Sequence, residues 1–192
     1  MANDRRVPAR AVTAVTVRPA EAADADALGA VSGRAFDATY RGIVPDAALD
    51  EWIGEGAASW RAALEHRPPD SSTRAWVAER DGSVIGYATT SPARANWLPP
   101  PEGAGELTNL YLDPDVIGTG VGRLLYDHAV ADLRDRGFDP LVVWAFRANQ
   151  RARRFYEGRG LAIDVPDHAW VLADVACPIV RFRGTLGPAA AR

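Results

Sequence analysis

The sequence contains no lysine, because all 22 of its basic residues are arginine. The phosphate-binding loop GxxxxGK[ST] requires a lysine, so that class of nucleotide site is excluded. Any phosphate group bound by this chain must be held by backbone N–H groups and by arginine. A formal net charge of −3 also gives no reason to expect a nucleic-acid or anionic-membrane partner.

Cysteine is almost as scarce, since Cys177 is the only one. A single cysteine cannot form an internal disulfide, and its apolar surroundings in the sequence favour a core position over a nucleophile. No apolar run approaches the ~18 residues of a membrane span, and the opening MANDRRVPAR lacks the apolar core of a secretory signal. We therefore expect a cytoplasmic protein. His, Cys and Asp show no metal-ligand spacing, so we expect no metal.

The sequence that is present is typical of one soluble α/β domain, with 192 residues, 47% of them hydrophobic and 24% charged. We predict a tail over residues 1–11, a single domain over 12–186 and a frayed end over 187–192. Strands are predicted at 12–18, 75–80, 83–89, 106–112, 141–146, 161–165 and 178–184, and helices at 22–36, 46–52, 57–66, 124–136 and 149–159. Long loops are predicted at 91–105 and 166–173. This alternation implies a mixed sheet with helices on both faces.

Residues 105–123, GELTNLYLDPDVIGTGVGR, are the most informative stretch. They predict an apolar strand, an Asp-Pro-Asp break and a loop with Gly118, Gly120 and Gly122 that runs into a helix. Free backbone N–H groups at a helix start, together with the helix dipole, form an anion site that most often binds phosphate. The dinucleotide pattern GxGxxG fails because its last position is Arg123. A glycine-rich turn without a ligand is the alternative interpretation.

A second stretch, NQRARRFYEGRGL from Asn149, follows at helical spacing. Together the two stretches resemble the GNAT superfamily of acetyl-CoA-dependent N-acetyltransferases. That family carries a Leu-Tyr-Val-like strand end, Asp-Pro, [Gln/Arg]-x-x-Gly-x-[Gly/Ala] and, downstream, Asn-x-x-Ala-x-x-Phe-Tyr-x-x-x-Gly. The chain departs from the pattern at Ile117, where the family usually has Gln or Arg. We expect the Ile117 N–H still to face the phosphates, with weaker or altered contacts to the cofactor.

The resemblance implies the GNAT fold, a central mixed, mostly antiparallel sheet of six to seven strands flanked by helices on both faces. It implies transfer of an acetyl group from acetyl-CoA to a primary amine, here of a small molecule, by direct attack in a ternary complex without a metal. Homodimers are common in the family. Two alternatives remain open: a non-catalytic acyl-CoA-binding sensor domain and a protein N-terminal acetyltransferase.

The resemblance also assigns residues to the cofactor. These are Leu110, Tyr111, Leu112, Ile117, Gly118, Thr119, Gly120, Val121, Gly122, Arg123, Asn149 and Tyr156. The strand that ends at Leu112 would separate from its neighbour at a bulge and offer main-chain groups, with the Leu110 N–H as the oxyanion donor. Arg123 and Arg153 are candidates to supply charge near the phosphates. Asn149 is equally suited to capping a helix.

Two residues are assigned to catalysis. Tyr156 matches the tyrosine that protonates the leaving thiolate, and the alternative is an aromatic core pair with Phe155. Glu106 matches the glutamate of histone-acetylating members and would serve as the base, and the alternative is a surface carboxylate on an edge strand. His128 and His168 are weaker base candidates. The position of another glutamate used in the family is Trp144 here.

Substrate contacts are expected from the loops that flank this site. They would come from Phe36, Tyr40, Trp97 and Trp170, an aromatic set, with Asp37 and Asp167 available for a cation. These residues specify no particular amine.

Overall fold

The computed structural model describes residues 14–66, 68, 71–95 and 97–187. The predicted tail over 1–11, the first two residues of the strand predicted at 12–18 and the end beyond 187 lie outside them. The elements run in the order β1 (Thr16–Pro19), a 3-10 turn (Ala22–Asp24), α1 (Ala25–Tyr40), α2 (Asp46–Glu65), β2 (Arg74–Arg80), β3 (Ser83–Pro92), β4 (Gly105–Leu112), a second 3-10 turn (Pro114–Val116), α3 (Val121–Asp135), β5 (Leu141–Phe146), α4 (Gln150–Glu157), β6 (Ala162–Leu172) and β7 (Val175–Gly184).

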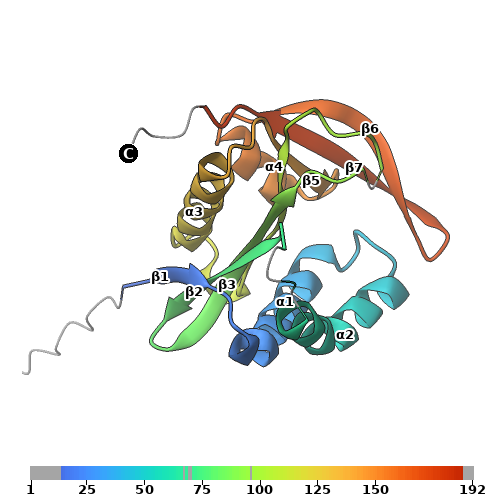
Figure 1. Ribbon diagram of the computed structural model, residues 1–192. Helices are drawn as coiled ribbons and strands as arrows, with labels where there is room; N and C mark the ends of the chain where they lie inside the picture. Colours follow the sequence, from blue (N-terminus) through green and yellow to red (C-terminus); the bar gives the residue numbers. More distant parts are fainter. Residues whose placement is uncertain (1–13, 67, 69–70, 96, 188–192) are drawn as a thin grey trace, which may run out of the picture.

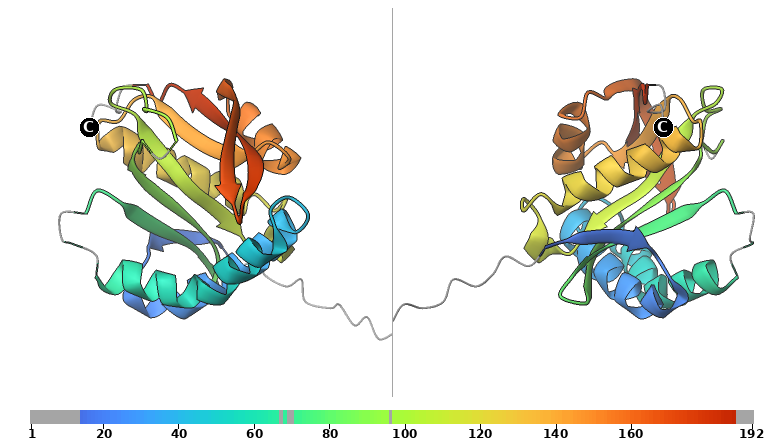
Figure 2. Two further views of the ribbon diagram at one scale, coloured as in Figure 1. Left: turned by 90° about the vertical axis from the view of Figure 1, so that its right-hand side faces the viewer. Right: turned by 60° about the vertical axis from the view of Figure 1, so that its left-hand side comes forward.

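One seven-stranded sheet organises the chain, with strand order β1-β2-β3-β4-β5-β7-β6. Neighbouring strands are antiparallel except β4 and β5, which are parallel. Helices α1 and α2 lie on one side of the sheet, and α3 and α4 lie on the other (Figures 1 and 2). The predicted mixed, mostly antiparallel sheet with helices on both faces is confirmed.

Two predictions differ most from the structure. The helices predicted at 46–52 and 57–66 are one helix, α2. It continues through its glycines because it packs closely against α1, where Gly29 of α1 and Gly56 of α2 leave room for the contact. A Cβ on Gly29 would lie 2.6 Å from the Ala57 backbone. The loop predicted at 166–173 is mostly strand β6. Its turn back into β7 is made by Ala173 and Asp174, both in the left-handed region, at φ 44° and 61°.

The sheet opens between its two parallel strands. β4 and β5 pair only at Gly105 with Leu141 and at Glu106 with Val142. On the other side of β4 the register with β3 shifts between Thr89 and Thr90, which pair with residues 109 and 107. An extra residue in one strand bends that strand away from its neighbour. Past Glu106, the edge of β4 that faces β5 therefore has no strand partner among the described residues.

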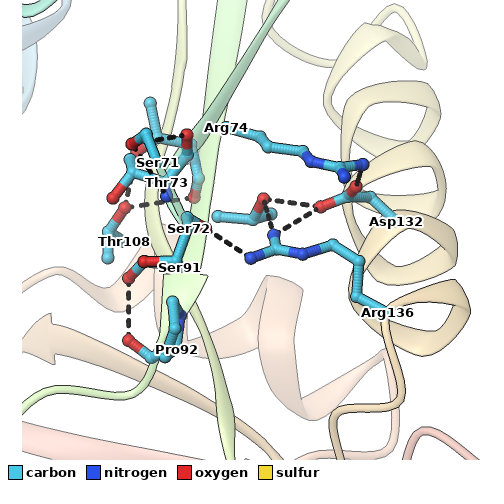
Figure 3. A network of polar contacts seen from close by, with 11 residues as sticks. Ser71, Ser72, Thr73, Arg74, Ser91, Pro92, Thr108, Asp132 and Arg136 are labelled. Atoms are coloured by element: carbon cyan, nitrogen blue, oxygen red, sulfur yellow. Dashed lines mark hydrogen bonds and ion pairs between the residues drawn. The ribbon is translucent and has the colours of Figure 1, made fainter. Parts of the chain in front are cut away.

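A polar network around Asp132 fastens the far end of α3 to the sheet (Figure 3). The buried Asp132 carboxylate accepts hydrogen bonds from the Thr90 hydroxyl at 2.7 Å, from Arg74 at 2.7 Å and from Arg136 at 3.1 Å. Arg136 also donates to the carbonyl of Ser72. One carboxylate thus joins α3 to the ends of β2 and β3, on the opposite face of the sheet from α1 and α2.

We expect Asp132→Asn to lower the free energy of unfolding by about 2 kcal/mol, because the amide keeps the shape but loses charge-assisted bonds in a buried position. Asp127→Asn is the matched control on the same helix. Its partner Arg123 lies 3.5 Å away and both side chains are exposed, so the loss should stay below about 0.5 kcal/mol. Urea unfolding of the two variants measures the difference, and equal stabilities would contradict a structural role for the network.

Candidate active site

Two cavities adjoin at the opening between β4 and β5. The first, of about 490 Å³, is bounded by the glycine loop, β4, β5 and α4, and we call it the glycine-loop cavity. The second, of about 510 Å³, is bounded by α1, α2, β4, β5 and β6, and we call it the tryptophan cavity. Six residues line both of them: Tyr40, Thr108, Asn109, Tyr111, Trp144 and Ala145. The open stretch of β4 is therefore a wall that the two cavities share.

Most of the residues that the sequence assigned to the cofactor line the glycine-loop cavity. Of the twelve residues assigned to the cofactor, the lining includes Leu110, Tyr111, Leu112, Ile117, Gly118, Gly120, Gly122, Arg123, Asn149 and Tyr156. Thr119 and Val121 are not in the lining, and Val121, the first residue of α3, is buried in the core. Their roles in binding stay predictions, but the geometry brings the two motifs of the sequence to one cavity.

The free N–H groups of the glycine loop begin later than predicted. The Ile117 N–H donates to the Pro114 carbonyl at 3.3 Å, and the Thr119 N–H donates to the Val116 carbonyl at 3.3 Å. The expectation that the Ile117 N–H faces a phosphate is therefore wrong. Gly120 precedes α3 at φ 94°, and the first N–H groups of a helix have no acceptor within it. The first turn of α3 is therefore the candidate anion site.

Arginine side chains add positive charge to this cavity. Arg123 lines it as predicted, whereas Arg153 does not and instead lies 3.5 Å from the Arg147 carbonyl. Residues two apart on a helix point in nearly opposite directions, so Arg151 occupies the place that was expected of Arg153. Arg151 donates to the Thr39 hydroxyl at 2.9 Å, and Arg159 also lines the cavity.

Tyr156 both packs in the core and lines the glycine-loop cavity. Its ring centroid lies 5.5 Å from those of Phe155 and Phe182, so the predicted aromatic pair exists. Burial raises the pKa of the Tyr156 phenol well above its usual value, and the neighbouring Tyr111 and Tyr126 add to the rise. The phenol therefore stays protonated and can donate a proton into the cavity. The core position and the cavity position are compatible.

Asn149 likewise combines the two interpretations of its sequence position. Its side-chain oxygen accepts the Ala152 N–H at 3.1 Å, which caps α4, and the residue lines the glycine-loop cavity.

The tryptophan cavity contains all four residues predicted for substrate: Phe36, Tyr40, Trp97 and Trp170. Asp37 and Asp167 are not part of it, because they form ion pairs with Arg41 at 2.6 Å and with Arg147 at 2.5 Å on the surface. Sequence reasoning missed several lining residues, namely Trp52, Glu55, Ser59, Trp60 and Arg94. The first four lie on α2 at the spacing of one helix face, a signal that the two-helix prediction split apart.

Glu106 lies in the tryptophan cavity next to the point where β4 and β5 separate. The residue is only 5% exposed and β4 is central in the sheet, so the alternative of an edge-strand surface carboxylate is wrong. Burial raises the pKa of the Glu106 carboxyl, although the Arg94 N–H, which donates to it at 3.2 Å, works in the opposite direction. A carboxylate with a raised pKa is a stronger base toward a substrate ammonium.

The two histidines considered as bases lie outside both cavities. The His128 ring packs against Trp76 at 4.3 Å on the α3 side, and the His168 ring lies 5.9 Å from Trp144. Over the described ranges, no three His, Cys, Asp or Glu side chains gather as metal ligands, and no helix is long and apolar enough to cross a membrane.

A pair of tyrosine hydroxyls marks the junction of the two cavities. The hydroxyl oxygens of Tyr40 and Tyr111 lie 2.6 Å apart, and both residues line both cavities. Their rings, from α1 and β4, therefore lie where the two cavities adjoin.

The chain is similar in sequence to known acetyltransferases. A family model described as the acetyltransferase (GNAT) family matches residues 35–161. An uncharacterized N-acetyltransferase of Mycobacterium bovis is 31% identical over 143 residues, which are 73% of this chain and 85% of that protein. The mycothiol acetyltransferase of Thermobispora bispora is 37% identical over 86 residues, but the match spans only 28% of that relative.

Solved structures share the fold at low sequence identity. The PaiA N-acetyltransferase of Thermoplasma acidophilum, solved with coenzyme A, superposes with a TM-score of 0.71 at 19% identity and covers 88% of this chain and 98% of its own. The yncA protein of Salmonella typhimurium, solved with its cofactor acetyl-CoA, gives a TM-score of 0.64 at 20% identity over 94% of this chain and 98% of its own.

Proposed function

Because the chain belongs to the GNAT acetyltransferase family, we propose that it transfers the acetyl group of acetyl-CoA to the primary amine of a small molecule. The observation that carries the proposal is the meeting of two cavities at the opening of the sheet, with a buried carboxylate in one and a buried phenol in the other. A proton acceptor and a proton donor on opposite sides of one strand suit an acyl transfer between two substrates.

The glycine-loop cavity fits acetyl-CoA by its donor set. The first turn of α3 offers N–H groups to phosphate oxygens, and Arg123, Arg151 and Arg159 supply the charge that lysine cannot. The open edge of β4 offers main-chain groups to an amide-containing arm such as pantetheine. When bound, acetyl-CoA supplies an activated acetyl thioester at the junction of the cavities.

Residues of the chain would then carry out the proton transfers of the reaction. Glu106 accepts a proton from the acceptor's ammonium group and leaves a neutral amine beside the junction. The Leu110 N–H donates to the oxygen that gains negative charge, and Tyr156 donates its proton to the departing sulfur. Cys177 lies buried in β7 and lines neither cavity, which favours direct transfer over a cysteine-bound intermediate.

The test of donor binding uses two glycines at opposite ends of α3. Gly120 and Gly137 have φ values of 94° and 81°, and a Cβ on either would meet nothing within 4 Å. Alanine at either position should cost about 1 kcal/mol of stability, because a left-handed backbone disfavours a side chain. Only Gly120→Ala re-aims the N–H groups at the anion site, so we expect it to raise the Kd for coenzyme A about tenfold.

Isothermal titration of coenzyme A measures that Kd, and release of free thiol in the presence of amines measures turnover. Gly137→Ala should bind coenzyme A like the unmodified protein. An unmodified protein that binds no coenzyme A or acetyl-CoA would refute the proposal, and binding without thiol release on any amine would favour a non-catalytic sensor. Equal weakening by the two alanine variants would remove the anion site from the first turn of α3.

A further inference from the structure

The tryptophan cavity gathers an unusual share of the chain's largest side chains. Five of the six tryptophans line it: Trp52, Trp60, Trp97, Trp144 and Trp170. They come from α2, from the loop before β4, from β5 and from β6, so the fold brings together residues up to 118 positions apart in the sequence. The sixth, Trp76, packs against His128 on the other face of the sheet.

Four of these rings form a continuous wall. Trp52 stacks on Trp170 at 5.3 Å with an interplanar angle of 22°, Trp170 lies 5.5 Å from Trp97, and Trp97 lies 5.0 Å from Trp144. All four are only half-buried, although they surround a cavity of about 510 Å³. Half-buried aromatic faces gain about 25 cal/mol for each Å² of apolar surface that an occupant covers, and they also attract cations.

Three polar side chains of this cavity, those of Ser32, Thr108 and Asn109, are paired within the protein. The Ser32 hydroxyl donates to Tyr87 at 2.9 Å and accepts from the Trp60 indole at 3.0 Å. The Thr108 hydroxyl lies 2.5 Å from that of Thr89, and the Asn109 amide donates to the same Thr89 hydroxyl at 2.7 Å. A polyol or sugar needs several free partners for its hydroxyl groups, because a buried polar group without one is costly.

One buried carboxylate, that of Glu106, lines the cavity. The other carboxylate in the lining, Glu55, is exposed on α2. A single buried acceptor of positive charge suits an occupant with one ammonium group placed inward, whereas a polyamine would carry further charges along the aromatic wall.

We infer that the acceptor is a monoamine with an aromatic or similarly bulky apolar ring, with its amino group toward Glu106 and its ring along the tryptophan wall. This inference rests on the proposed acetyl transfer and specifies its substrate class. The ring is recognised by stacking and burial, and the ammonium by Glu106 and the faces of the neighbouring indoles.

The test compares amines that share an aminoethyl head. With acetyl-CoA as donor, we expect kcat/KM for 2-phenylethylamine to exceed that for ethanolamine by at least about 100-fold, since only the phenyl group covers apolar wall. Spermidine, glucosamine and a peptide with a free N-terminus complete the panel, and each should fall well below 2-phenylethylamine. A preference for any of these would overturn the inference and leave the proposed acetyl transfer intact.

Two variants test whether the tryptophan wall causes the preference for an aromatic amine. Trp170→Ala removes the ring that stacks between Trp52 and Phe146, and we expect it to raise KM for 2-phenylethylamine at least tenfold with ethanolamine changed less than about threefold. Val171→Ala is the control, since Val171 is the next residue on β6 and is 62% exposed. Equal loss for both amines in Trp170→Ala would overturn the assignment.

Direct titration of the unmodified protein separates the two proposals. If no amine releases thiol from acetyl-CoA, the proposed function fails, and the inference is then decided by binding alone. In the presence of coenzyme A, 2-phenylethylamine should bind and change the tryptophan fluorescence, whereas glucosamine and spermidine should not. The reverse order of binding would overturn the inference without reference to catalysis.

Discussion

Glu106→Gln is expected to lower kcat/KM for the acceptor amine at neutral pH by about 10²- to 10³-fold, within the range that general base catalysis contributes. Glutamine keeps the shape of the side chain but cannot accept the ammonium proton. The ratio of kcat/KM between the unmodified protein and the variant should fall about tenfold for each unit of rising pH. The reason is that the variant depends on amine that is already neutral in solution, and this fraction rises about tenfold per pH unit below the pKa of the amine. A pH–rate profile from pH 6 to 10, recorded for both proteins, measures the convergence.

Glu102→Gln is the matched control, because Glu102 is exposed in the loop that leads to β4 and lines neither cavity. It should leave the profile unchanged. A Glu106→Gln enzyme that stays equally impaired at all pH values would show that Glu106 positions the substrate without acting as the base. A Glu106→Gln enzyme of full activity would exclude both roles.

The same substitution should not destabilise the fold. Burial raises the folded-state pKa of Glu106 above its ordinary value, so the folded state binds the proton more tightly than the unfolded state. Its contribution to stability is therefore fully present below the ordinary pKa and is lost as the pH rises through the raised value. Above that window the buried charge costs free energy, so Glu106→Gln should be as stable as the unmodified protein or more stable. Thermal unfolding at pH 5 and pH 8 checks the sign, and lower stability of the variant at pH 8 would contradict it.

The cofactor side of the site was accessible from the sequence because its determinants are local. Gly118 and Gly120 have φ values of 83° and 94°, which glycine adopts without strain, and the helix they precede follows at once in the chain. Asn149 caps one short helix and Tyr156 lies within it, at a spacing that is visible in the sequence. The Ile117 N–H was misplaced because it bonds to the Pro114 carbonyl at the end of a 3-10 turn. The Asp-Pro-Asp sequence marks the start of that turn but does not show which N–H groups it occupies.

The acceptor side could be predicted only in part because its determinants are tertiary. Trp97 and Trp170 were assigned to the substrate from the family layout, but their contact at 5.5 Å depends on β6 extending through the predicted loop to Leu172. Pro166 argued against a strand there, yet an edge strand tolerates proline, and β6 is the last strand of the sheet. Trp52 was placed on a helix of the wrong length, so its side of the cavity could not be inferred.

Tyr156→Phe is the second large expected effect, a fall in kcat of at least tenfold with KM for acetyl-CoA changed less than about threefold. In the proposed mechanism the phenol donates a proton only to the departing sulfur, so its removal should act on the chemical step and not on binding. Burial raises the pKa of Tyr156, which keeps the phenol protonated throughout the working pH range but makes it a weaker acid. The effect should therefore lie near the lower end of the range for general acid catalysis. Steady-state rates of thiol release, with both substrates varied, measure it.

Tyr126→Phe separates this role from core packing. Tyr126 lies in the same apolar cluster, its ring is 5.6 Å from Phe155, and burial raises its pKa to about 12, yet it lines neither cavity. Removing its hydroxyl should leave kcat unchanged at a similar cost in stability. If the two phenylalanine variants lose rate and stability together, Tyr156 acts through packing alone, and the proton for the departing sulfur must come from water or from the tyrosine pair at the junction. If only Tyr156→Phe loses rate, the phenol that the sequence motif singled out is the acid.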